Sequence, residues 1–175
     1  MKYAGKIGNL LSQQIIDNSI SLGERLKHIE PDVYNIFSCG IDSGFGSSAT
    51  GIVLTEFIKE DKMRVFYAEQ FKDHPDPQMI VDKIFEFHKK YFNLWVNIDG
   101  SARGFITSLK IAFGENPNYD KAEDVLPDNN KILPVSFNKD HKQMISHLAS
   151  LFNDGYVGIP EQFDKHNCTQ KCCRF

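Results

Sequence analysis

The chain has 175 residues, of which 41% are hydrophobic, with a formal net charge of -3 and four cysteines. These values predict one soluble globular domain with a sizeable core, and they argue against a strongly basic nucleic-acid coat and against a secreted disulfide framework. No stretch approaches the roughly 18 apolar residues of a membrane span, and the N-terminus lacks a signal-peptide core, so we expect a cytoplasmic protein.

The segment 1–33 is predicted to be a linker and helix before the main domain, which we expect over 34–160. Apolar residues at helical spacing predict this helix over 9–23, with Gly23 as its stop. The helix either connects to something upstream or packs on the flank of the domain. Residues 161–175 show no periodicity and are expected to form an irregular, disordered tail.

Three strands are expected at the start of the domain. The first and second flank a glycine-rich turn between Tyr34 and Glu56, and Asp42 lies where the first strand ends. A short charged connection leads to a third strand over 63–71. Short connections join antiparallel neighbours, so the three strands are predicted to form a meander.

Helices and strands alternate in the rest of the domain. Asp76 and Pro77 are expected to begin a helix that precedes the strand Leu94–Asp99. There follow a helix over 102–113, a long polar loop over 114–130, a strand over 132–137, a helix from Asp140 to Gly155 and a short strand over 156–159. This order predicts an α/β fold with flanking helices and a mixed sheet, antiparallel in strands one to three and parallel afterwards.

Two aspartates lie at strand ends, Asp42 after the first strand and Asp99 after the fourth. A right-handed crossover through the intervening helix would set these strands parallel, with the carboxylates roughly 5 Å apart if the strands are neighbours. A divalent cation would relieve their repulsion, and a pair of such ions about 3.5–4 Å apart is suited to phosphodiester hydrolysis. Taken singly, each aspartate is also explained as a turn former, and Asp99 as a cap of the following helix.

Four segments resemble the C-terminal nuclease domain of a viral DNA-packaging terminase large subunit, of the archaeal-virus type. They are Gly40–Ser48, Tyr67–Phe71, Val96–Gly100 and Pro134–Lys142. The resemblance extends over residues 2–165, and its first residues are similar to the join between that family's ATPase and nuclease domains.

The resemblance implies an RNase H-like fold and a metal-dependent endonuclease that cuts concatemeric DNA during genome packaging. It makes Asp42 and Asp99 the catalytic and metal-binding residues for two Mg²⁺ or Mn²⁺ ions, with Asp42 bridging both ions. The implied partners are double-stranded DNA, a terminase ATPase domain, the small terminase subunit and the portal, in the cytoplasm of a host cell and away from membranes.

Two features depart from the family pattern. The sequence contains no Gly-x-x-x-x-Gly-Lys-Ser/Thr motif, so we expect the chain not to be the packaging motor by itself. The family takes a third acid from a helix near its C-terminus, whereas the nearest acid here, Asp164, matches a non-catalytic position. We therefore expect a truncated, incomplete site and reduced or absent activity. The alternatives are an actin-like or sugar-kinase ATPase fragment and a non-enzymatic DNA-binding remnant.

Other polar residues carry weaker hypotheses. Candidate contacts to the DNA backbone, which are otherwise solvated helix starts, are Arg103, Lys139, His141 and Lys142. Glu69, two strands from Asp42, is expected to be solvated or paired with a helix. One further cluster could hold zinc but lacks the second pair of ligands usual in structural zinc sites, so a disordered tail is expected there instead: His166, Cys168, Cys172 and Cys173.

Overall fold

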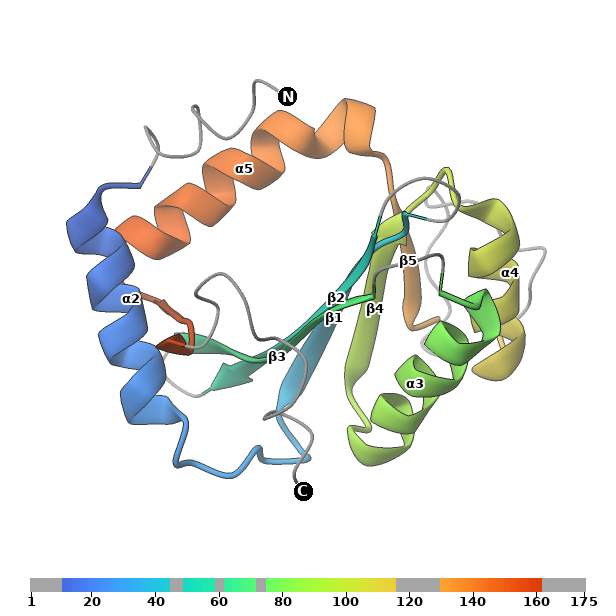
Figure 1. Cartoon of the computed structure of the whole chain (residues 1–175), viewed down its shortest axis with the longest axis horizontal. Helices are drawn as coiled ribbons and strands as arrows, with labels where there is room; N and C mark the ends of the chain where they lie inside the picture. The colour runs from blue at the N-terminus through green and yellow to red at the C-terminus, as the bar shows by residue number, and fades with distance from the viewer. Residues whose placement is uncertain (1–10, 45–48, 59–61, 72–74, 116–129, 162–175) are drawn as a thin grey trace.

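A single mixed sheet organises the protein, with its strands in the order β5-β4-β1-β2-β3-β6. The computed structural model describes residues 11–44, 49–58, 62–71, 75–115 and 130–161. Figure 1 shows the sheet nearly edge-on, with helices α3 and α4 on one face, α5 across the other and α2 beside the β6 end.

The strand pairing confirms the predicted mixed sheet. The strands β1 (Ile36–Asp42), β2 (Thr50–Ile58) and β3 (Lys62–Phe71) form the antiparallel meander. On the other side of β1, β4 (Leu94–Asp99) pairs in parallel, and β5 (Ile132–Val135) pairs in parallel with β4. The remaining strand, β6 (Val157–Gly158), is a two-residue strand parallel to β3.

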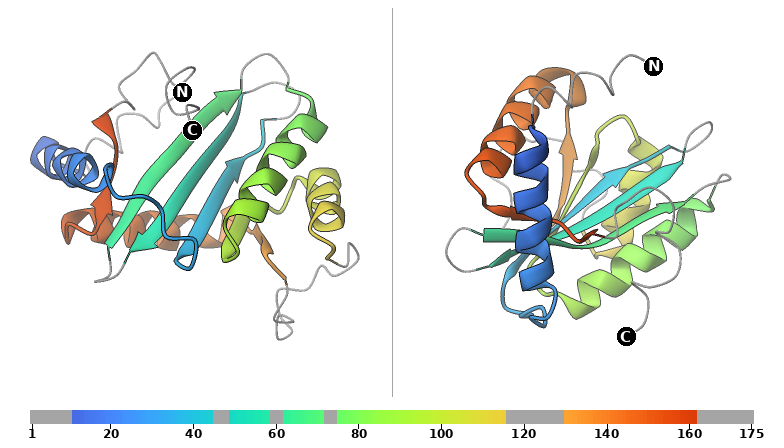
Figure 2. Two further views of the ribbon diagram at one scale, coloured as in Figure 1. Left: turned by 90° about the horizontal axis from the view of Figure 1, so that it is seen from below. Right: turned by 60° about the vertical axis from the view of Figure 1, so that its left-hand side comes forward.

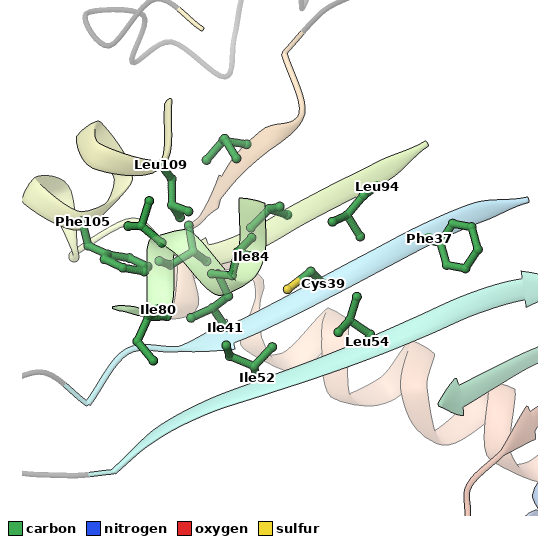
Figure 3. Packing of buried hydrophobic residues seen from close by; sticks show 14 of the residues in the cluster. Phe37, Cys39, Ile41, Ile52, Leu54, Ile80, Ile84, Leu94, Phe105 and Leu109 are labelled. Carbon is green, nitrogen blue, oxygen red and sulfur yellow. The ribbon is translucent and has the colours of Figure 1, made fainter. Parts of the chain in front are cut away.

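The main core lies between the sheet and the helices α3 (Pro77–Lys90) and α4 (Arg103–Ala112). Alternate residues of β1 point into it, and Phe37 and Cys39 are completely buried there (Figure 3). Ile80 and Ile84 of α3 belong to the same buried cluster (Figure 3). Because successive side chains of a strand alternate between faces, the residues between these buried positions point to the α5 side.

Helix α2 (Gln13–Leu26) packs on the flank of the domain, beside β6 (Figure 2). The backbone N–H of Ile159 donates to the carbonyl of Ser19 at 3.1 Å. The prediction that Gly23 stops this helix is wrong, because Gly23 lies within α2. Its backbone packs directly on Ile159, so glycine is required there by a close approach of two chain segments and not by a helix end.

The ends of the other helices agree with the sequence in part. The side chain of Asp76 accepts a hydrogen bond from Gln78 N at 3.0 Å, with Pro77 at the first helical position, as predicted. Helix α5 (Phe137–Asn153) starts before Asp140, which was predicted to cap it and instead lies in its first turn. The strand β5 ends where β4 ends, so the chain turns into α5 earlier than the apolar pattern indicated.

A buried ion pair fastens the segment between α2 and β1 to the sheet. Arg64 Nε donates to Glu56 Oε2 at 2.7 Å, and both side chains are almost completely buried. The other oxygen of Glu56 accepts from Asp32 N at 3.0 Å and from Asn35 Nδ2 at 2.8 Å. Arg64 also donates to the carbonyl of Leu26, the last residue of α2.

Several predictions fall outside the described residues, namely most of the loop 114–130, the tail after Glu161, Asp164 and the His166–Cys173 cluster. The division of the chain into three segments stays a prediction. In the part of the chain that is described, no helix is both long enough and apolar enough to cross a membrane.

Candidate active site

The two predicted aspartates come together at the carboxyl edge of the sheet. The strands β1 and β4 are in register from Phe37 opposite Leu94 to Ile41 opposite Ile98. The next residues in this register are Asp42 and Asp99, the last residues of their strands. Neighbouring strands lie about 4.8 Å apart. The two carboxylates therefore occupy adjacent positions, on the face toward α5.

Two glycines leave a hollow beside these carboxylates. Gly51 lies opposite Asp42 on β2, and Gly40 precedes Asp42 by two residues on the same face of β1. Among the described residues, a Cβ at Gly40 would meet nothing within 4 Å, and one at Gly51 would meet only the Cβ of Asp42 at 4.0 Å. Packing therefore does not require glycine at either position. Glycine inside a strand often marks a place where a ligand approaches the backbone closely.

Behind the aspartates lies a polar pair that the sequence reasoning missed. Asn97 precedes Asp99 by two residues on β4, lies opposite Gly40, and donates from Nδ2 to Ser38 Oγ at 3.0 Å. The available signal was an asparagine, a residue disfavoured in strands, inside a buried strand and two positions before the aspartate.

Asp99 also takes part in a local turn. Its Oδ1 accepts a hydrogen bond from Ser101 N at 2.9 Å. It does not cap the following helix, since the residue at the start of α4 is Ala102 and no side chain caps that end. The turn uses one lone pair of the carboxylate, and the second oxygen can still bind a ligand.

These residues fit a divalent cation of the Mg²⁺ type. Such ions prefer oxygen ligands and are often held by one or two carboxylates, with water and substrate phosphate completing the coordination. The hollow at Gly40 and Gly51 provides the space. Within the described residues, no group of three or more His, Cys, Asp or Glu side chains gathers at one place. The described part of the site therefore consists of two carboxylates.

The predicted DNA-contacting residues lie at the starts of two helices. Arg103 is the first residue of α4, and Lys139 and Lys142 lie in the first turns of α5; all three are exposed. These helices follow the parallel strands β4 and β5, so they begin near the edge that carries the aspartates. His141 instead faces the sheet, where it and Ser38 line a cavity of about 570 Å³ beneath α5.

Glu69 belongs to the opposite face of the sheet. It pairs in register with the buried Ile52 and forms a salt bridge with Lys83 of α3 at 2.5 Å. This confirms the expectation that Glu69 is paired with a helix.

Glu115 supports β5, the strand that pairs with the Asp99-bearing strand β4. Its Oε1 accepts hydrogen bonds from the backbone N–H groups of Lys131 and Ile132, at the start of β5. Burial raises the pKa of this carboxyl group, while those hydrogen bonds act in the opposite direction. At the other end of β5, Val135 O accepts from Gly100 N at 2.9 Å. Glu115 thus helps to hold the strand to which the turn after Asp99 is attached.

No protein-family model matches the sequence, and no curated protein matches it either. The structure is similar to the human cytomegalovirus terminase nuclease domain, Mn soaked and inhibitor bound, with a TM-score of 0.59, 15% identity and coverage of 94% of this chain and 81% of that chain. It is also similar to the large terminase nuclease from thermophilic phage G20c with bound magnesium, with a TM-score of 0.53, 20% identity and coverage of 74% of this chain and 60% of that chain. The Thermus phage P74-26 large terminase nuclease domain matches with a TM-score of 0.51, 18% identity and coverage of 74% of this chain and 58% of that chain.

At these identities the likeness establishes the fold. The chain has the RNase H-like fold of terminase nuclease domains, and the predicted resemblance is confirmed at this level. The assignment to the archaeal-virus type stays a prediction. The chain spans about three fifths of the length of the phage domains that it matches.

Proposed function

We propose that this chain is the nuclease domain of a viral terminase large subunit, a metal-dependent endonuclease that cuts concatemeric DNA during genome packaging. The observation that carries the proposal is the placement of Asp42 and Asp99 next to each other, in register, beside the hollow at Gly40 and Gly51. The fold supports it, because similar domains were solved with Mn and with magnesium.

In this proposal Asp42 and Asp99 would be the protein ligands of the Mg²⁺ or Mn²⁺ ions, two of which would serve phosphodiester hydrolysis. When bound, such ions stabilise the charge that develops on the phosphate and lower the pKa of the attacking water. Among the described residues, Gly40 and Gly51 place no side chain of their own in the way of a phosphate that approaches Asp42. Arg103, Lys139 and Lys142 would contact backbone phosphates near the same edge. His141, which faces the sheet, is left out of these proposed contacts.

The remaining parts of the proposal follow from the terminase assignment. The substrate would be double-stranded DNA in a host cytoplasm, and the partners would be a terminase ATPase domain, the small subunit and the portal. The described residues supply two carboxylates where the family uses three acids, so we propose that the chain alone turns over slowly or not at all.

Nicking of supercoiled plasmid in the presence of Mn²⁺ or Mg²⁺ tests this function. We expect nicking that EDTA stops and that Asp42→Asn and Asp99→Asn each abolish. Asp82→Asn, an exposed carboxylate of α3, is the matched control and should leave the rate unchanged. Nicking that survives both aspartate substitutions would refute the assigned site.

If the wild-type chain does not nick DNA, binding measurements distinguish the nuclease hypothesis from its two alternatives. Mn²⁺ binding that requires both aspartates would support an incomplete nuclease site. Nucleotide binding without cleavage would favour the actin-like or sugar-kinase alternative. DNA binding with neither metal nor nucleotide binding would favour the non-enzymatic remnant.

A further inference from the structure

We infer that Asn97 is a further positioning residue of the carboxylate site. Its amide oxygen, oriented by Ser38, accepts hydrogen bonds from the hydration shell of a divalent cation held by Asp42 and Asp99. The inference rests on the proposed function and adds to it a neutral oxygen donor next to the two carboxylates.

The position of Asn97 follows from the strand register. It lies on the same face as the aspartates, one pair of positions behind them, and its partner across β1 is Gly40. Because Gly40 has no side chain and a Cβ there would meet none of the described residues within 4 Å, the amide of Asn97 borders the hollow. A partly buried amide needs hydrogen bonds to offset the loss of water, and among the described residues one bond to Ser38 is formed.

The bond to Ser38 orients the amide. Ser38 pairs with Trp95 across β1 and β4. This pair lies two residues closer to the starts of the strands than the pair Gly40 and Asn97. The Nδ2 group donates in that direction, to Ser38 Oγ at 3.0 Å. The oxygen is on the other branch of the amide, and in this inference Oδ1 takes the side nearer the ends of the strands, where Asp42 and Asp99 lie.

The bond to Ser38 also bears on whether contact with a cation is direct or indirect. It holds the amide of Asn97 toward the starts of the strands, away from Asp42 and Asp99. The inferred contact of Asn97 with the cation therefore passes through a layer of water. Outer contacts of this kind typically change metal affinity by about 10- to 100-fold.

Isothermal titration of Mn²⁺ into the chain and its variants tests the inference. Asn97→Leu should weaken Mn²⁺ binding by about 10- to 100-fold. Asn97→Asp keeps an oxygen at this position and should not show the loss of Mn²⁺ affinity expected for Asn97→Leu. Ser38→Ala frees the amide to rotate and should weaken Mn²⁺ binding less than Asn97→Leu does. Thr55→Val removes a polar group from the residue opposite Ser38 on β2 and should leave binding unchanged.

The aspartate variants separate failure of this inference from failure of the proposed function. Unchanged Mn²⁺ affinity in both Asp42→Asn and Asp99→Asn would show that the proposed site is wrong. If these variants lose binding while Asn97→Leu binds within about twofold of the wild type, the role of Asn97 alone is overturned. A loss in Asn97→Leu that Asn97→Asp fails to restore, or that matches a lower metal-free unfolding midpoint, would also overturn it.

Discussion

Replacing Gly23 by alanine should destabilise the protein, although glycine to alanine inside a helix usually stabilises by about 1 kcal/mol. Gly23 lies in α2, where the chain after β6 crosses the helix. A Cβ at this position would come within 3.0 Å of the backbone N, C and O of Ile159. A backbone cannot move aside as the end of a flexible side chain can. Helix α2 and the β6 segment must therefore separate to accommodate the methyl group.

The size of the effect follows from what the separation exposes. Val157 is 2% exposed and Leu22 is 7% exposed in the native structure. Complete exposure of such a side chain costs about 1.5–3 kcal/mol. The hydrogen bond from Ile159 N to Ser19 O contributes about 1 kcal/mol more. With partial exposure, and after subtracting the gain in helix propensity, we expect a net loss of about 2–4 kcal/mol.

Urea unfolding followed by circular dichroism measures this loss. The matched control is Gly104→Ala in α4, where a Cβ would meet no described residue within 4 Å. That variant should be neutral or stabilised by up to about 1 kcal/mol. An unfolding midpoint for Gly23→Ala at or above that of the wild type would refute the close packing of the β6 segment on α2.

Three further predictions concern buried charges and metal. The raised pKa of Glu115 means that the folded state binds its proton more tightly than the unfolded state, so stability should fall as pH rises from about 4.5 through the folded-state pKa. Glu115→Gln keeps an acceptor for the N–H groups of β5 and should remove this fall in stability, which urea unfolding at several pH values measures. If the variant retains the fall, Glu115 is not its cause. Arg64→Met should cost about 3–5 kcal/mol of unfolding free energy because it leaves Glu56 buried without its partner, and adding Glu56→Gln should recover part of that loss; strictly additive losses would refute the coupling. Mn²⁺ should raise the melting temperature of the wild type and not that of Asp42→Asn, and equal shifts would exclude binding at Asp42.

Much of the fold could be predicted from local sequence patterns. The Asp76-Pro77 helix start and the Leu94–Asp99 strand depend on hydrogen bonds and burial that neighbouring residues determine, and both were predicted correctly. The role of Gly23 could not be predicted in this way. It depends on Ile159, which is distant in the chain and lies against α2 in the folded structure. The start of α5 was missed because the end of β5 is set by its partner strand.

The candidate site also contains residues that could be predicted from the sequence and residues that could not. Asp42 and Asp99 could be predicted as neighbours because the handedness of a crossover constrains how their strands pair. Asn97, Ser38 and Gly40 could not, because their relation depends on register across the sheet. Asn97 and Ser38 are 59 residues apart in the chain. Glycine at position 40 has no local signature, since its significance is the space it leaves opposite Asn97.

The unequal covering of the two faces determines from which side a substrate can approach. On the α3 and α4 side, Leu94 and Leu109 are 0% exposed. On the other side, none of the described side chains of α5 is fully buried, and Val53 on the sheet remains 40% exposed.

Asp42 and Asp99 point to this open side. A polymer could therefore reach them without disturbing the closed core. For the same reason, substitutions at the carboxylates should change metal binding and cleavage while leaving the packing beneath α3 and α4 intact. Measuring metal-free stability beside metal affinity then separates a functional defect from a folding defect.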